Sequence, residues 1–78
     1  MELGIYKHYK GDFYQVIGVA CHTETGQEMV VYQALYGKYQ LWIRPKIMFC
    51  ETVMHNDKQV DRFAFINNPL KAASAIRI

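Results

Sequence analysis

Apolar residues along the chain fall into six short runs that are separated by turn-forming residues. Lys10-Gly11-Asp12 and Asn56-Asp57-Lys58 are two of these turn signals. The runs are rich in Val, Ile, Tyr and Phe, which favour strands. They cover residues 4–9, 13–22, 28–36, 39–44, 49–54 and 60–66. Runs of this length and spacing predict a mostly β chain that forms a small antiparallel barrel of five to six strands.

The run over residues 28–36 is apolar on both of its faces. Side chains alternate along a strand, so Met29 and Val31 share one face while Val30 and Tyr32 share the other. Only one face of a barrel strand can point into the interior. We therefore expect the second face to be covered by the C-terminal tail, by a partner or by a ligand.

A single helical turn is predicted just after the fourth run. Pro45 blocks continued strand pairing, and the segment that follows is too short for a longer helix. We expect this turn to place Ile47 and Met48 over the barrel as a plug. SH3-like barrels often carry such a turn before their last strand, so an SH3-like barrel is the expected fold class.

The end of the chain predicts a short C-terminal helix. Asn68 is a favoured N-cap residue, Pro69 suits the first helical position, and three alanines follow. The expected organisation is thus one β-barrel domain over residues 1–66 and a helical tail over residues 67–78. So short a helix must dock on something to be stable.

Size and charge restrict the classes of function. The 78 residues suit one domain, and the content of 51% hydrophobic and 14% aromatic residues suits a compact core. A net charge of +2 is far from the strongly basic composition of a dedicated nucleic-acid-binding protein, although it permits a local basic patch. The chain lacks a signal-peptide pattern and an apolar run long enough to span a membrane, so we expect a cytoplasmic protein.

Cys21 and Cys50 are each isolated in the sequence and form no CxxC pair. We interpret them as reduced cysteines in an apolar core, with a mutual disulfide as the less favoured alternative. The three histidines are too widely spaced for a zinc site, so no metal and no cofactor are expected.

Five ordered blocks of residues resemble the bacterial family of domains of unknown function 1653, over about residues 4–66. The blocks include His8-Tyr9-Lys10-Gly11, Val30-Val31-Tyr32 and Trp42-x-Arg44-Pro45. The resemblance implies a short stand-alone protein and transfers no activity. Cys21 and Gly26 depart from the family pattern, which usually has a basic and an apolar residue there. Eight polar or aromatic residues within the blocks are candidate site residues: His8, His22, Glu24, Tyr36, Trp42, Arg44, Glu51 and Arg62.

Trp42 and Arg44 are the strongest of these candidates. They are two positions apart, so they lie on one face of a strand and can frame a pocket with an aromatic floor and a cationic donor. Arg44 could instead serve architecture by pairing with Glu51 or Glu24. His22 and Glu24 also share a strand face and could act as an acid–base pair, but exposed polar residues are ordinary at a hairpin end.

Three hypotheses follow. The first is a non-enzymatic binding module that recognises a protein segment or single-stranded nucleic acid through Tyr36, Trp42 and Arg44. The second is a small enzyme or ligand-binding domain for a nucleotide-like metabolite, which requires His8, His22, Glu24 and Glu51 to converge. The third is a homo-oligomer that buries its apolar outer face against a copy of itself.

Overall fold

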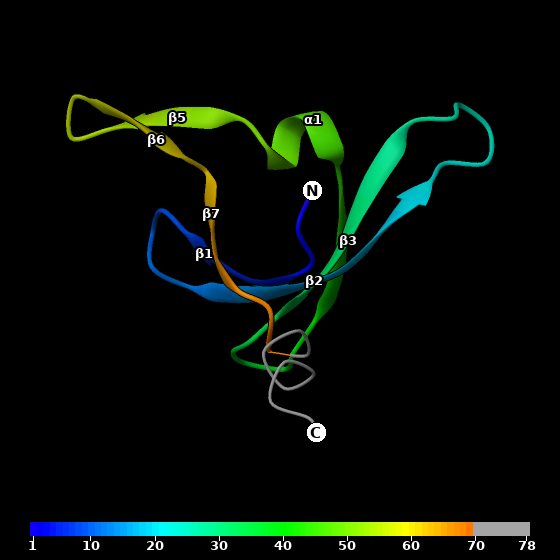
Figure 1. Ribbon diagram of the computed structural model, residues 1–78, viewed down its shortest axis with the longest axis horizontal. Coiled ribbons are helices and arrows are strands. Elements are labelled where there is room, and N and C mark those ends of the chain that lie inside the picture. The colour runs from blue at the N-terminus through cyan, green and yellow to red at the C-terminus, as the bar shows by residue number, and fades with distance from the viewer. Residues whose placement is uncertain (70–78) are drawn as a thin grey trace, which may run out of the picture.

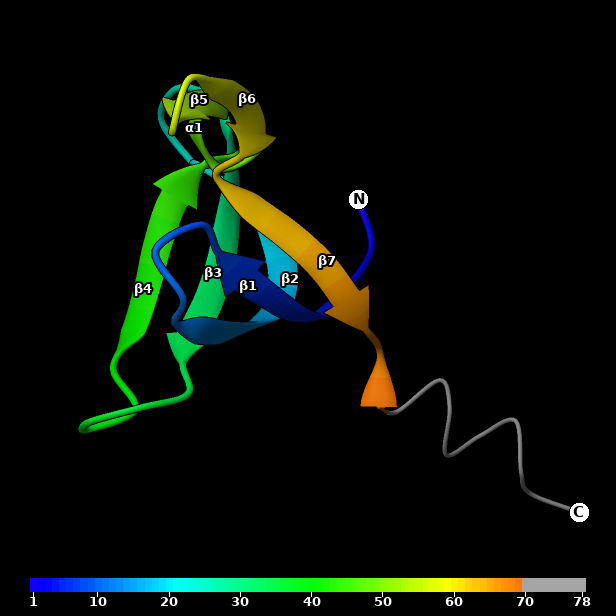
Figure 2. The same ribbon diagram turned by 90° about the vertical axis from the view of Figure 1, so that its left-hand side faces the viewer.

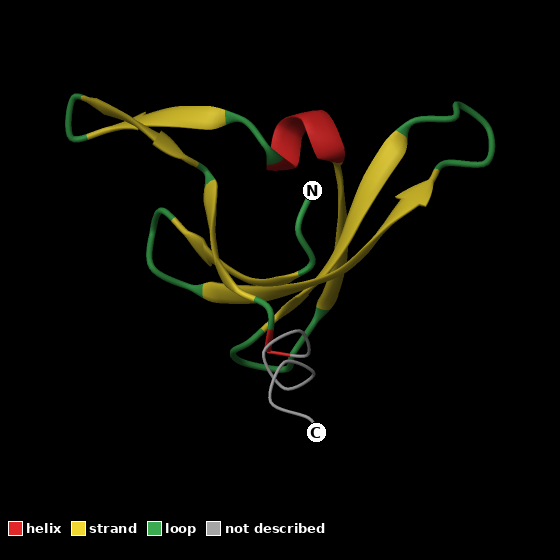
Figure 3. Cartoon of the chain, in the orientation of Figure 1, coloured by secondary structure: helices red, strands yellow, loops and turns green. Residues whose placement is uncertain are grey.

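The computed structural model describes residues 1–69 and shows a chain built mainly from antiparallel strands (Figures 1 and 3). The strands are β1 (Gly4–His8), β2 (Phe13–Cys21), β3 (Glu28–Ala34), β4 (Leu41–Pro45), β5 (Thr52–His55), β6 (Lys58–Asp61) and β7 (Phe63–Asn67). The one-turn helix α1 (Lys46–Phe49) lies between β4 and β5, where a helical turn was predicted. No helix in the described part of the chain is long and apolar enough to cross a membrane.

The strands form one five-stranded sheet, in the order β4-β3-β2-β1-β7, and a separate hairpin of β5 and β6. Within residues 1–69 no pairing joins β4 to β7, so the predicted closed barrel is not formed. The predicted run 60–66 is divided at Arg62: β6 turns back along β5, whereas β7 pairs with β1. The chain therefore has more strands than the predicted five or six.

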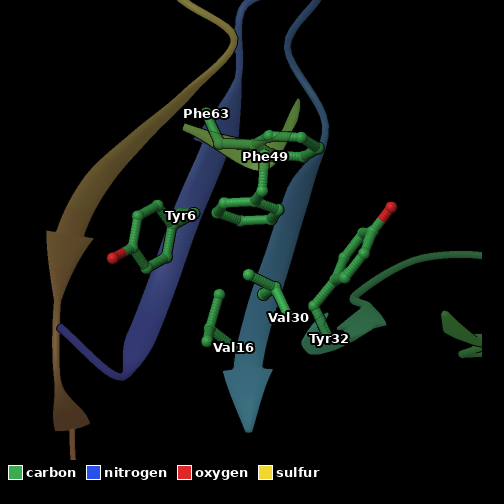
Figure 4. Close-up of a cluster of buried hydrophobic side chains, with 6 residues drawn as sticks. All are labelled: Tyr6, Val16, Val30, Tyr32, Phe49 and Phe63. Atoms are coloured by element: carbon green, nitrogen blue, oxygen red, sulfur yellow. The ribbon is translucent and has the colours of Figure 1, made fainter. Parts of the chain in front are cut away.

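One face of the sheet carries the core, and we call it the inner face. Strand register sets this face, because Val16 lies opposite Tyr32 and Tyr6 lies opposite both Tyr14 and Phe65. The alternation predicted for the third run is confirmed, since Val30 and Tyr32 are buried. Figure 4 shows the resulting cluster of side chains, and its members are Tyr6, Val16, Val30, Tyr32, Phe49 and Phe63.

Phe49, at the end of α1, is the residue that plugs the inner face. It is 1% exposed, and its ring stacks on Phe63 with a centroid separation of 4.1 Å. The prediction that Ile47 and Met48 form the plug was wrong, since they are 78% and 46% exposed. A single turn directs only one side of its residues inward, and here the last residue occupies that side.

The other face of the sheet, the outer face, keeps much of its apolar surface exposed in the described residues. Leu41, Ile43 and Phe13 are all exposed there. The tail that was expected to cover this face and to form a helix covers residues 67–78, of which 70–78 lie outside the described part. Cys21 and Cys50 are free, as expected, but both are exposed, so their placement in the core was wrong.

Candidate functional site

A pocket opens on the inner face beside the core cluster. Its volume is about 240 Å³. Seven side chains from five strands and one loop line it: His8, Tyr14, Tyr32, Tyr36, Trp42, Arg44 and Phe63. Four of them, His8, Tyr36, Trp42 and Arg44, are among the eight candidates from the sequence. We call this the aromatic pocket.

Strand register brings the lining residues together. Trp42 of β4 lies opposite Tyr32 of β3, and Arg44 lies opposite Val30. His8 of β1 lies opposite Phe63 of β7, with ring centroids 4.9 Å apart. Since opposed residues in an antiparallel pair point to the same face, alternation alone directs all of these side chains inward.

Tyr36 enters the pocket from the loop between β3 and β4. Its hydroxyl lies 3.0 Å from that of Tyr14, and the loop is closed by a hydrogen bond from the amide N–H of Tyr39 to the carbonyl of Tyr36. Gly37 and Tyr39 both have positive φ, of 59° and 54°, which turns the chain sharply at this point. Burial, and next the hydrogen bond with Tyr36, raise the pKa of Tyr14, so the Tyr14 hydroxyl stays protonated at neutral pH.

Arg44 is held by rings rather than by a carboxylate. Its Nε donates to the Tyr32 hydroxyl at 3.3 Å, and its guanidinium lies 5.7 Å from the centre of the Phe63 ring. The alternative pairing of Arg44 with Glu51 or Glu24 is absent from the described residues, where Glu51 pairs with Arg62 at 3.9 Å. Arg44 therefore has guanidinium donors available to a ligand.

The electrostatic potential at His8, on the wall of the aromatic pocket, is positive. The pKa of His8 lies below its usual value, first because burial disfavours the charged ring and then because Lys10, Arg62 and Arg44 repel it. Asp12 opposes this effect. His8 Nδ1 accepts a hydrogen bond from the amide of Lys10 at 3.1 Å, which places the proton of the neutral ring on Nε2 as a further donor.

The lowered pKa of His8 predicts a loss of stability in mild acid. Below the unfolded value of 6.5 the unfolded chain binds the proton more readily than the folded one, so the free energy of unfolding falls as pH drops. Urea unfolding between about pH 7 and pH 5 measures this slope. His8→Gln is expected to reduce the slope, whereas the matched control His22→Gln, in an exposed turn, keeps it. Equal slopes in all three proteins would contradict the assignment.

The chemistry available in the aromatic pocket is recognition. Its lining supplies aromatic faces and hydrogen-bond donors, and it includes no carboxylate, thiol or serine. Within residues 1–69 no group of three or more His, Cys, Asp or Glu side chains is placed to hold a metal ion. The lining thus suits a planar group that carries acceptors or negative charge.

The other candidates lie elsewhere. His22 and Glu24 are in the exposed turn between β2 and β3, where His22 Nδ1 accepts the backbone N–H of Glu24 at 3.2 Å. Glu51 and Arg62 flank the β5–β6 hairpin, and the amide of Arg62 also donates to the carbonyl of Glu51. These contacts close the hairpin, which is an architectural role.

Sequence reasoning did not include Tyr14, Tyr32 and Phe63 among the site residues. The signal for them was the strand alternation, because Tyr14 is two positions before Val16 and Tyr32 is two after Val30. Tyr32 and Phe63 belong to the core cluster and Tyr14 packs against it, and all three also line the aromatic pocket.

Comparisons with known proteins agree with one another. A family model described as a protein of unknown function, DUF1653, matches residues 4–65. The chain is also similar to a crystal structure of a DUF1653 protein from Bordetella bronchiseptica, with 34% identity and a TM-score of 0.81. That match covers 87% of this chain and 90% of the other. No curated protein matched the sequence. This chain belongs to the DUF1653 family.

Proposed function

We propose that the protein is a non-catalytic binding module whose aromatic pocket receives a base of single-stranded nucleic acid. The observation that carries the proposal is the composition of the pocket: four aromatic phenol or indole side chains surround an arginine that lacks a carboxylate partner in the described residues. Bases stack on such rings regardless of their sequence, and the adjoining phosphates pair with arginine.

The charge of the pocket selects against the main competing ligand, a cation. Aromatic cages that bind methylated ammonium groups depend on electron-rich rings without a competing positive charge. Here Arg44 already occupies the cationic position on Phe63, and Lys10 and Arg62 add to the positive field at His8. A cationic ligand would be repelled, whereas an anionic one would be attracted.

Cations beyond the pocket favour a polyanion over a small anion. Lys38 lies in the exposed turn next to Tyr36, and Lys10 lies in the turn after β1. A strand of nucleic acid with one base in the pocket could contact such flanking cations through its phosphates. With a net charge of only +2, we expect this binding to be weak and sensitive to salt.

The fold supports a recognition role. We propose that the curved sheet, the turn α1 and the strands after it form an opened relative of the SH3-like barrel, a class of module that binds ligands on its surface. The enzyme alternative required His22, Glu24 and Glu51 to converge with His8. The aromatic pocket includes His8 but none of those three, which weighs against the enzyme alternative.

The single tryptophan of the chain is Trp42, so its fluorescence reports directly on the pocket. The probes are an oligouridine, uridine monophosphate, an acidic tyrosine-containing peptide and a trimethyl-lysine peptide. We expect the oligouridine to bind best and to lose affinity as salt rises. Preference for either peptide would contradict the proposal, and equal affinity for the monophosphate would favour the metabolite-binding alternative.

A further inference from the structure

Strand β4 is an edge strand of the five-stranded sheet, and Figure 2 shows it at one side of the molecule. The amide of Ala34 donates to the carbonyl of Gln40, which fixes the hydrogen-bonded positions of the β3–β4 ladder. Hydrogen-bonded and non-hydrogen-bonded positions alternate along the ladder. The main-chain groups of Trp42 and Arg44 therefore form hydrogen bonds with β3, whereas those of Leu41 and Ile43 point away from it.

The outer face of this edge strand carries no charged side chain that would prevent strand addition. Edge strands are commonly protected by charged side chains on the strand, by bulges or by covering segments. On its outer face β4 carries Leu41 and Ile43, which are 53% and 64% exposed. Its one proline, Pro45, stands at the end of the strand and is also the N-cap of α1, so its carbonyl accepts the first hydrogen bond of that turn and has a second lone pair that can accept another.

We propose that β4 pairs with β4 of a second copy of the chain, antiparallel and with the two-fold axis at Ile43. In this register Ile43 lies opposite the partner's Ile43, and each donates its N–H to the other's carbonyl. Leu41 lies opposite the partner's Pro45 and donates to its carbonyl. The two sheets become one continuous sheet, and the interface is isologous.

The missing N–H of Pro45 coincides with a carbonyl that does not need it. Proline has no N–H, so Pro45 cannot donate to the carbonyl of the partner's Leu41. That carbonyl is the one that already accepts a hydrogen bond within its own chain, from Gln40 Nε2 at 3.3 Å. The register therefore leaves no main-chain group of Leu41 or Ile43 without a partner.

Side chains are also complementary on both faces. On the outer face the register opposes Ile43 to the partner's Ile43, and Leu41 to the partner's Pro45, which buries apolar surface. On the inner face Trp42 lies opposite the partner's Arg44, at a non-hydrogen-bonded position where side chains come close. An arginine and an indole form a favourable cation–π pair. The two aromatic pockets therefore meet at the two-fold axis, where each Trp42 faces the partner's Arg44.

The short length of β4 makes this a weak dimer. Five-residue strands bury less than the ~1,200 Å² of a standard stable interface. We expect dissociation in the range of roughly 10 µM to 1 mM. Sedimentation of the intact chain across that range should show a concentration-dependent dimer, and a monomer at every concentration would overturn the proposal.

Amide hydrogen exchange by NMR locates the contact. The amides of Leu41 and Ile43 should become protected only as concentration rises, whereas those of Trp42 and Arg44 are protected throughout by β3. If Leu41 and Ile43 exchange freely in a sample that is mostly dimer, the contact lies elsewhere and the proposal fails.

Ile43→Lys places two lysines opposite each other and should weaken dimerisation about tenfold or more. Ile47→Lys, on the exposed side of α1, is the matched control and should leave dimerisation unchanged. Circular dichroism verifies that both variants fold. A dimer lost with Ile47→Lys but kept with Ile43→Lys would overturn the proposal. Oligouridine binding measured at high dilution tests the aromatic pocket separately, because the chain is then monomeric.

Discussion

Phe49→Ala is expected to lower the free energy of unfolding by about 3–5 kcal/mol, the usual cost of removing a buried phenylalanine. Phe49 is almost fully buried, stacks on Phe63, and makes edge-to-face contacts with Tyr6 and Tyr32 at centroid distances of 5.4 and 5.3 Å. Small domains have only about 5–15 kcal/mol of stability in total. Urea unfolding followed by circular dichroism measures the loss.

Phe13→Ala is the matched control, because Phe13 lies on the exposed outer face at the start of β2. We expect it to change stability by less than about 1 kcal/mol. If the two variants unfold at the same urea concentration, Phe49 is not the residue that holds α1 onto the sheet.

Trp42→Ala is expected to weaken oligouridine binding by about 5- to 150-fold, which corresponds to the 1–3 kcal/mol of one stacked base. Trp42 is 50% exposed, so its removal takes away a face of the pocket without opening the core. The variant has no tryptophan, and binding is therefore measured by the fluorescence anisotropy of a labelled oligouridine.

Trp42→Phe should recover part of the affinity, because phenylalanine keeps a stacking face. Phe13→Ala should bind like the unmodified chain, which shows that the loss is specific to the pocket and not to any exposed aromatic residue. Unchanged affinity in a folded Trp42→Ala variant would remove the aromatic pocket as the binding site.

The strand pattern of the sequence predicted a large part of this fold. Alternation in β3 correctly separated Val30 and Tyr32 from Met29 and Val31, because one face of that strand is covered and the period of a strand is two residues. The same rule placed Trp42 and Arg44 together on one face. Such local rules succeed wherever neighbouring residues alone decide the direction of a side chain.

Predictions failed where the outcome depends on contacts between distant segments. Whether the sheet closes depends on how β7 meets β4, and no local pattern contains that information. The single turn α1 could present Met48 or Phe49 inward with similar propensity, and the stacking on Phe63 decides in favour of Phe49. Likewise Arg62, remote from Arg44 in sequence, is the residue that pairs with Glu51.

The sequence predicted only part of the candidate site, because the site also depends on contacts between distant segments. Trp42, Arg44, His8 and Tyr36 were identified as polar or aromatic residues within the five blocks, and the sheet brings them together. Tyr14 and Phe63 could not be distinguished from core residues, because each serves both the core and the pocket. His22 and Glu24 had a suitable spacing for chemistry, but they lie in an exposed turn away from the pocket.

The most direct test of the central claim is a nitrogen–proton NMR spectrum of the labelled protein during titration with oligouridine. We predict the largest shifts at the indole N–H of Trp42 and the Nε–H of Arg44, with smaller ones at the amides of His8 and Tyr36. Largest shifts in the turn that carries His22 and Glu24, or on the outer face at Phe13 and Ile43, would contradict the claim.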